Sequence, residues 1–418
     1  MGNGFRIFIC VLLMASPAWG AGPADVPGAS VQGLLEWLER DSAELSAARH
    51  EAAAAQQQAE AAGTLPDPSV RIDWWDISRN NPTLDPRMDG QTMYSVQQPI
   101  PGWGKRDAQK RAGEADAAVA REKQRAVTAE LRTQVKLAYA QYYQAYHALQ
   151  LNEELGGFTD TVAQLAQSRY ETGLASQQEM VRAQLEQSAL QTERYGLQAE
   201  FSQSQARINA LLNRPAHAEL REPAALRPMP LTVVMNETAL EQRLHDASPE
   251  LAGQAALVAS AESNADLAHR NLTPDFTVGF GPVQRGSTLS TWNAMLEFTL
   301  PLHHDTHHAH QHQADEMLEA SRARRQATEV RVLGELRERY AALQAAQQQE
   351  ALIVQRALPL ADLAFRGALA GYRNGRVDFS TLLEAKRQVQ KTKLDQLNAQ
   401  IAQQINLAEI ERLIGEDL

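Results

Sequence analysis

The chain has 418 residues, a net charge of −11 and 44% hydrophobic residues, of which few are aromatic. The acidic balance excludes a nucleic-acid partner, which would need a basic surface. The only cysteine, Cys10, lies near the start, so the rest of the chain has no disulfide and no cysteine-based metal centre. A composition rich in Ala, Gln, Glu, Leu and Arg favours long helices over a compact mixed core.

The first residues have the pattern of a secretory signal. Arg6 provides the positive charge, and residues 7–15 form an apolar run that is too short for a membrane-spanning helix. The small residues Ala18 and Gly20 mark a cleavage site, and we expect cleavage after Gly20; the alternative is an uncleaved anchor. No later stretch is apolar enough for a membrane helix, so this chain could cross a membrane only as a β-barrel.

The rest of the chain contains two ordered copies of one pattern. The stretch YETGLAS begins at Tyr170, and its counterpart YRNGRVD begins at Tyr372. Ile208 and Ile410 match at the same spacing. Each copy runs from a helix through a Pro-Asp or Asp-Pro break, a strand hairpin, a proline, a very long helix, the Tyr-x-x-Gly turn and a second long helix. This shared order predicts a gene duplication.

The segment after each Pro-Asp break has a period of two, which is typical of a strand. In the second copy, Trp292, Leu296 and Phe298 point to one side, and in the first copy Val70 and Ile72 do the same. Each copy therefore predicts one hairpin with strands of roughly ten residues, a length that fits a tilted membrane-spanning strand. The alternative is a soluble hairpin that packs on the helices.

Long helices follow each hairpin. Residues 105–172 contain no proline and keep a helical apolar spacing, which predicts a helix of roughly 100 Å. Residues 307–374 are the counterpart. Helices of this length have to form coiled coils with their neighbours. The Gly156-Gly157 pair and Pro359 occupy matching positions, and we expect both to weaken or bend their helices.

The Tyr-x-x-Gly motif stands where one long helix has to stop and reverse. Gly173 and Gly375 can take the positive φ that such a turn requires. Ser176 and Asp378 follow three positions later and are favourable helix N-caps. The motif therefore predicts the tip of a helical hairpin in each copy.

The signal, the two copies of strand hairpin plus helical hairpin, and the Tyr-x-x-Gly-Leu tip together resemble the TolC-type outer-membrane efflux factors. The resemblance implies a mainly α-helical fold with a membrane β-barrel. In that family a homotrimer forms, and each chain gives four strands to a twelve-stranded barrel and four long helices to a periplasmic tunnel. The resemblance also implies the Gram-negative outer membrane and its lipid, a long periplasmic extension, a periplasmic adaptor protein and an inner-membrane pump.

In that family the tunnel tips face the adaptor. The resemblance implies an adaptor-docking end made of Tyr170, Gly173, Leu174, Ser176, Tyr372, Gly375 and Asp378. The second tip departs from the family pattern, because Arg376 stands where the first tip has Leu174. The chain looks most like the branch that works with heavy-metal pumps of the resistance-nodulation-division type.

These patterns divide the chain into four parts. The signal covers residues 1–20, the first repeat 21–212, an equatorial segment 213–240 and the second repeat 241–418. In the first repeat we predict strands within about 69–98 and long helices at about 105–172 and 176–212. In the second repeat we predict strands within about 276–300 and long helices at about 307–374 and 378–414.

Histidines concentrate where the second long helix starts. Six of the eleven lie in HHDTHHAHQH, namely His303, His304, His307, His308, His310 and His312. Histidines four residues apart share a helix face and suit a divalent metal such as Zn, Cu, Ni or Co. The first repeat has no histidine at this point, so the fold does not need the run. The alternative is a polar, solvated helix start.

No nucleophile–base arrangement or phosphate-binding loop stands out, so we do not expect an enzyme, and we expect no resident cofactor apart from a divalent metal at the histidine run. We expect a passive exit duct for heavy-metal cations. One alternative is the same duct serving drug efflux or type I protein secretion. The other is a periplasmic coiled-coil or metal-buffering protein without a pore.

Overall fold

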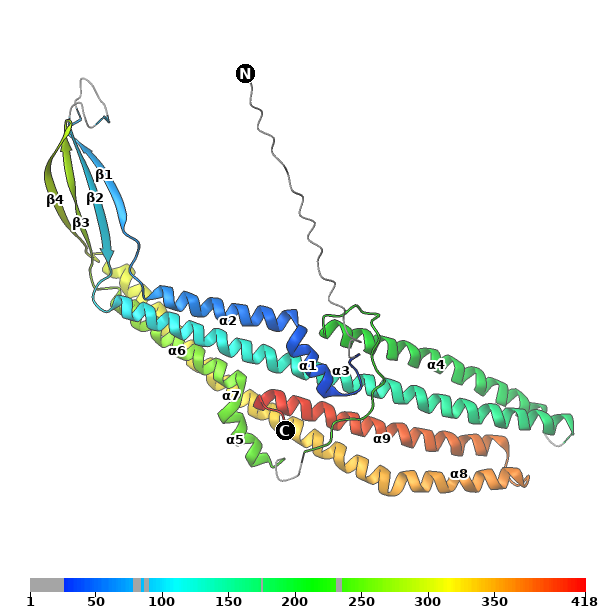
Figure 1. Cartoon of the computed structure of the whole chain (residues 1–418). Coiled ribbons are helices and arrows are strands. Elements are labelled where there is room, and N and C mark those ends of the chain that lie inside the picture. Colours follow the sequence, from blue (N-terminus) through cyan, green and yellow to red (C-terminus); the bar gives the residue numbers. More distant parts are fainter. Residues whose placement is uncertain (1–25, 78–83, 86–89, 174–175, 231–234) are drawn as a thin grey trace, which may run out of the picture.

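The computed structural model describes residues 26–77, 84–85, 90–173, 176–230 and 235–418. The predicted signal peptide and Leu174 lie outside these residues. The fold is mainly helical, with a small sheet at one end and long helices that extend away from it (Figure 1). No helix among the described residues combines the length and the apolar composition needed to cross a membrane.

The same order of elements occurs twice, which confirms the predicted repeat. The first copy contains α1 (Val31–Asp41), α2 (Ala43–Ala62), β1 (Ser69–Trp75), β2 (Gln91–Ile100), α3 (Lys105–Glu171) and α4 (Gln177–Leu211). The second contains α5 (Glu237–Ala247), α6 (Pro249–Arg270), β3 (Asp275–Arg285), β4 (Thr288–Thr299), α7 (His304–Leu352), a π-helical turn η1 (Ile353–Ala357), α8 (Leu358–Arg373) and α9 (Phe379–Ile414).

The four strands form one antiparallel sheet in the order β1-β2-β3-β4. The two hairpins join through β2 and β3, where Val96 lies opposite Phe280. A Cβ atom on Gly281 would collide with the backbone carbonyl of Tyr94, so this close approach of β2 and β3 requires glycine. Among the described residues, β1 and β4 each have a strand partner on one side only.

The helices form a layer that is open at both sides. Near the sheet the neighbours follow the order α2, α3, α6 and α7, and at the far end they follow the order α4, α3, α9 and α8 (Figure 1). The long helix α3 belongs to both rows and connects them. The two outer helices of each row therefore have one side without a helical neighbour in the part of the chain that the structure describes.

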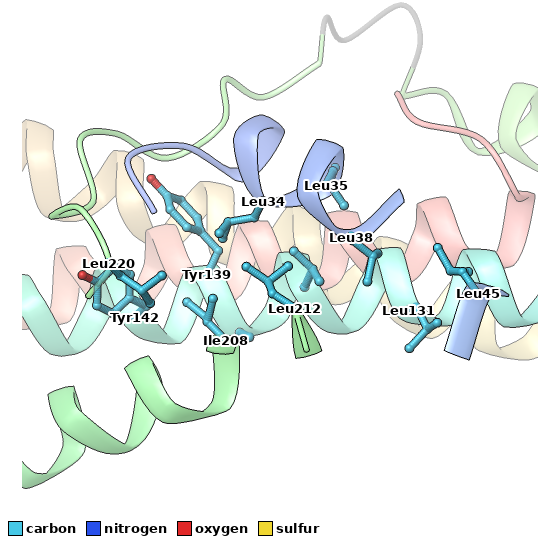
Figure 2. Packing of buried hydrophobic residues seen from close by; sticks show 12 residues of the cluster. Leu34, Leu35, Leu38, Leu45, Leu131, Tyr139, Tyr142, Ile208, Leu212 and Leu220 are labelled. Atoms are coloured by element: carbon cyan, nitrogen blue, oxygen red, sulfur yellow. The ribbon is translucent and has the colours of Figure 1, made fainter. Parts of the chain in front are cut away.

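Each repeat builds its own apolar core midway along the layer. In the first, Leu34 and Leu38 of α1 meet Tyr139 and Tyr142 of α3 and Ile208 at the end of α4 (Figure 2). The matching residue Ile410 of α9 lies in the second core with α5 and α7. The equivalent isoleucines are 1% and 0% exposed, so the duplication extends to the core packing.

Helix α7 begins at His304, three residues earlier than predicted. The π-turn η1 interrupts the long helix just before Pro359, where the sequence predicts a weak point. Proline removes a backbone donor and its ring crowds the carbonyl four residues earlier, which the wider turn relieves. The Gly156-Gly157 pair leaves α3 uninterrupted, because glycine keeps its N–H.

Candidate functional site

The two hairpin tips have the predicted turn geometry. Gly173 and Gly375 have φ values of +74° and +68°, and each N–H donates to the carbonyl of the tyrosine three residues earlier. The Ser176 hydroxyl accepts from the N–H of Glu179 at 3.3 Å. The Asp378 carboxylate accepts from the N–H of Thr381 at 3.0 Å, and its hydrogen bonds with Thr381 lower the pKa of Asp378. Both capping residues thus start the returning helix.

The tyrosines of the two motifs have different environments. Tyr170 is 40% exposed at the first tip, whereas Tyr372 is only 1% exposed. The Tyr372 ring lies 6.5 Å from that of Phe379, in a cluster with Val162 and Leu382. Burial raises the pKa of the Tyr372 phenol, and its hydroxyl has no hydrogen-bond partner among the described residues. Tyr170 is therefore available to a partner, and Tyr372 is a packing residue.

Arginines join the two hairpins close to their tips. The Arg169 guanidinium lies 5.1 Å from the centre of the Tyr372 ring and donates to the Tyr372 carbonyl at 3.4 Å. Further along, Arg387 of α9 holds the carboxylate of Glu186 on α4 with two hydrogen bonds, and this contact raises the pKa of Arg387. Sequence analysis missed these links, because the pairs are distant in sequence and charged residues are common on these helices.

A lysine links three helices above the tips. The Lys386 ammonium of α9 lies 5.2 Å from the ring centres of both Phe158 on α3 and Phe365 on α8. The two rings pack edge to face with their centres 5.4 Å apart. Burial lowers the pKa of Lys386. No local pattern in the sequence indicates this contact, because the three residues lie far apart in the chain.

The histidine run lies at the other end of the long helices. His303 is the N-cap of α7 and has a non-helical backbone, while the other five histidines of the run lie on the helix. The pair His303 and His307 therefore loses its helical spacing, whereas His304, His308 and His312 keep theirs. No group of three or more potential ligands is arranged to hold a metal within the described part of the chain.

The sheet has one apolar and one polar face. Residues opposite each other in the register share a face, and Val70, Val96 and Phe280 form one such row. The exposed large apolar side chains of the four strands are Val70, Ile72, Trp74, Trp75, Val96, Val278, Phe280, Leu289, Trp292, Leu296 and Phe298. The opposite face includes Ser95 and Gln97, which are buried.

The fold is shared with solved outer-membrane channels. VceC from Vibrio cholerae aligns with a TM-score of 0.78 at 17% identity, covering 93% of this chain and 96% of that one. CusC aligns with a TM-score of 0.79 at 17% identity over 93% and 92%. CmeC from Campylobacter jejuni aligns with a TM-score of 0.77 at 12% identity over 99% and 93%. A search of curated protein sequences found no match.

The sequence also matches the family model of the outer membrane efflux protein over residues 34–214 and 240–416. These ranges cover both repeats, so the chain belongs to the outer membrane efflux protein family. It is a transport channel and not an enzyme. Channels of this family are trimeric and work with an adaptor and an inner-membrane pump.

Proposed function

We propose that three copies of this chain form the outer-membrane exit duct of a tripartite efflux system and conduct substrate passively. The observation that carries this proposal is that, in the described residues, both the sheet and the helical layer end in two edges without a neighbour. An exposed strand edge invites pairing with another chain, and closing the sheet into a barrel removes it. Rotational symmetry closes such a layer when each copy covers the free edge of the next.

The exposed apolar face of the sheet supports a position in lipid. Trp292 is 67% exposed and stacks on Phe280, whose ring centre lies 5.0 Å away. Apolar side chains that face outward and polar side chains that face inward are the pattern of a membrane barrel. By the family resemblance, three chains with four strands each give a twelve-stranded barrel above an α-helical periplasmic tunnel.

The same closure accounts for exposed apolar side chains on the outer helices of the layer. Leu185 and Tyr195 of α4 are 70% and 66% exposed, and Leu360 and Leu363 of α8 are 65% and 67% exposed. Helices α4 and α8 are the two edges of the lower row. In the proposed trimer, α4 of one copy covers α8 of its neighbour and buries both sets.

The hairpin tips are the proposed docking end for the periplasmic adaptor. Tyr170, Gly173 and Ser176 of the first tip and Gly375 and Asp378 of the second are exposed, while Tyr372 supports the second tip from below. We assign the direct adaptor contacts to the exposed residues. The adaptor would belong to a system with an inner-membrane pump of the resistance-nodulation-division type.

For the cargo we propose heavy-metal cations, and the histidine run supports this choice. A deletion strain should then be sensitive to graded copper, zinc, cobalt, nickel or cadmium, and the native gene should restore growth. Sensitivity to dyes and detergents alone would assign the duct to drug efflux, and loss of a secreted protein would assign it to type I secretion. A soluble protein that does not run as a heat-modifiable trimer after membrane fractionation would contradict the duct itself.

A further inference from the structure

We propose that His304, His308 and His312 form a labile metal-binding face at the start of α7. The site takes a divalent cation of the Cu²⁺, Ni²⁺ or Zn²⁺ class through two imidazoles four residues apart, and water completes the coordination. Metal binding by this face stands on the structure alone; its use in transport rests on the proposed function.

These three histidines share a spacing of four residues along the helix. All three lie within α7, which starts at His304. Side chains four residues apart in a helix lie on one face with Cβ atoms about 5–6 Å apart, and two imidazole nitrogens can then reach one ion at about 2.0–2.1 Å. His308 belongs to both pairs. His310 lies on a different face, and His303 is outside the helix.

The imidazoles of the run are also free to bind. Within the described part of the chain, no hydrogen bond, ion pair or ring contact engages their side chains. Two histidines elsewhere show what a structural partner looks like: His269 lies 3.1 Å from the Asp315 carboxylate, and His147 lies 3.0 Å from Gln150 and contacts two tyrosine rings. A histidine that stabilises the fold makes such contacts, and those of the run do not.

Coordination by only two protein ligands allows the bound cation to be released again. The described residues bring no third ligand into the set, so the site differs from the closed four-ligand sites that hold structural zinc. Imidazole suits Cu, Ni and Zn, and the remaining water ligands allow exchange. A cation that passes through a duct has to leave as readily as it enters.

The position of each histidine pair along α7 predicts which pair binds the metal more tightly. The positive end of the helix dipole disfavours a cation near the N-terminus, and this effect fades beyond the first turn. His304 is the first residue of α7, so the pair His308 and His312 lies one turn further from the dipole end. We therefore expect His308 to matter most, His312 next and His304 least.

At the equivalent position in the first repeat, the start of α3, a positively charged side chain takes the place of the histidines. This helix begins at Lys105, whose ammonium lies 2.9 Å from the Asp275 carboxylate at the start of β3. A protonated lysine has no free lone pair and cannot bind a metal. The starts of α3 and α7 thus carry different side chains, and of the two only the start of α7 presents imidazoles.

The test uses the purified full-length protein in detergent with Cu²⁺, Ni²⁺ or Zn²⁺ alone as the probe. The variant H304A/H308A/H312A removes the proposed face, and the control H303A/H307A/H310A removes the same number of imidazoles from the same run. Calorimetry gives the affinity, and electron paramagnetic resonance of Cu²⁺ reports the nitrogen ligands. Circular dichroism and heat-modifiable migration verify that both variants fold and assemble.

We expect H304A/H308A/H312A to bind the metal at least about tenfold more weakly, because removing a residue that only orients a metal ligand already costs about that much. The control H303A/H307A/H310A should keep the native affinity. The single variant His308→Ala should account for most of the loss. Equal losses in both triple variants, or no binding by the native protein, would overturn the site. Neither result bears on the duct, which metal-sensitive growth and trimer formation test separately.

Discussion

The two repeats share one architecture, but they satisfy buried polar groups differently at one equivalent position. Asn209 follows Ile208 in the first core, and Glu411 follows Ile410 in the second. The Asn209 amide donates to the carbonyls of Ala216 and Ala218 at 3.3 and 2.7 Å. A neutral amide therefore fixes the segment that follows α4, and its oxygen also accepts from the Arg214 guanidinium at 3.2 Å.

Glu411 instead joins the two repeats by charge. Its carboxylate, 2% exposed, accepts from Lys136 of α3 at 2.7 Å and from Arg227 at 2.8 Å. The backbone N–H of Leu418 donates to it as well. Duplication thus preserves the backbone and the apolar core, while a single polar exchange turns a local contact into a link between the halves.

The variant with the largest expected effect removes the Glu411 carboxylate that joins the two repeats. Glu411→Leu leaves Lys136 and Arg227 without their shared carboxylate, and breaking a buried ion pair costs about 3–5 kcal/mol. Asn209→Leu leaves two backbone carbonyls without a donor and should cost less, about 1–3 kcal/mol. Thermal unfolding followed by circular dichroism should rank the two variants in this order. A larger loss for Asn209→Leu would contradict the comparison.

A smaller effect distinguishes the two tip tyrosines. Tyr372→Leu removes buried ring volume and should cost about 2–3 kcal/mol, whereas Tyr170→Leu should stay within about 0.5 kcal/mol. Tyr170→Leu should instead weaken adaptor binding, measured by surface plasmon resonance with the cognate adaptor. Tyr372→Phe serves as the control, because it deletes only the unpartnered hydroxyl. Equal destabilisation by the two leucine variants would show that both rings are packed alike.

The two tip glycines should behave alike. Gly173→Ala and Gly375→Ala each place a side chain at positive φ, which costs about 1–2 kcal/mol. No atom of the described residues lies within 4 Å of the added Cβ at either position, so we attribute the expected cost to the backbone conformation. The drop in melting temperature should therefore match. A clearly unequal drop would mean that one turn has a different conformation in the trimer.

The smallest effect is a gain in stability. Gly156→Ala adds a methyl group to an uninterrupted helix where no atom lies within 4 Å of the new Cβ. Such a change should stabilise the protein by about 0.4–1 kcal/mol, since it lowers the entropy of the unfolded chain. Gly157→Ala should do the same, and the melting temperature measures both. A loss of stability at these positions would indicate that a neighbouring chain approaches the glycines closely.

Features of the fold that depend on the local spacing of residues could be predicted from the sequence. Gly173 and Ser176 predicted the reversal of α3 into α4, and the alternation at Trp292 and Leu296 predicted β4. Features that depend on tertiary contact could not be predicted. The Tyr-x-x-Gly motif is the same in both copies, yet only Tyr372 is buried, because Phe379 and Val162 surround it. No local pattern connects Glu186 to Arg387 or Lys136 to Glu411.

The π-turn at Ile353–Ala357 has a consequence for the phase of the helix. In a regular α-helix, Leu352 and Leu360 would point about 80° apart, because successive residues rotate by about 100°. A π-turn inserts the equivalent of one extra residue, so the two side chains come within about 20° of each other. Both are more than half exposed. The turn therefore keeps these two exposed leucines on nearly the same side of the long helix as it passes from α7 into α8.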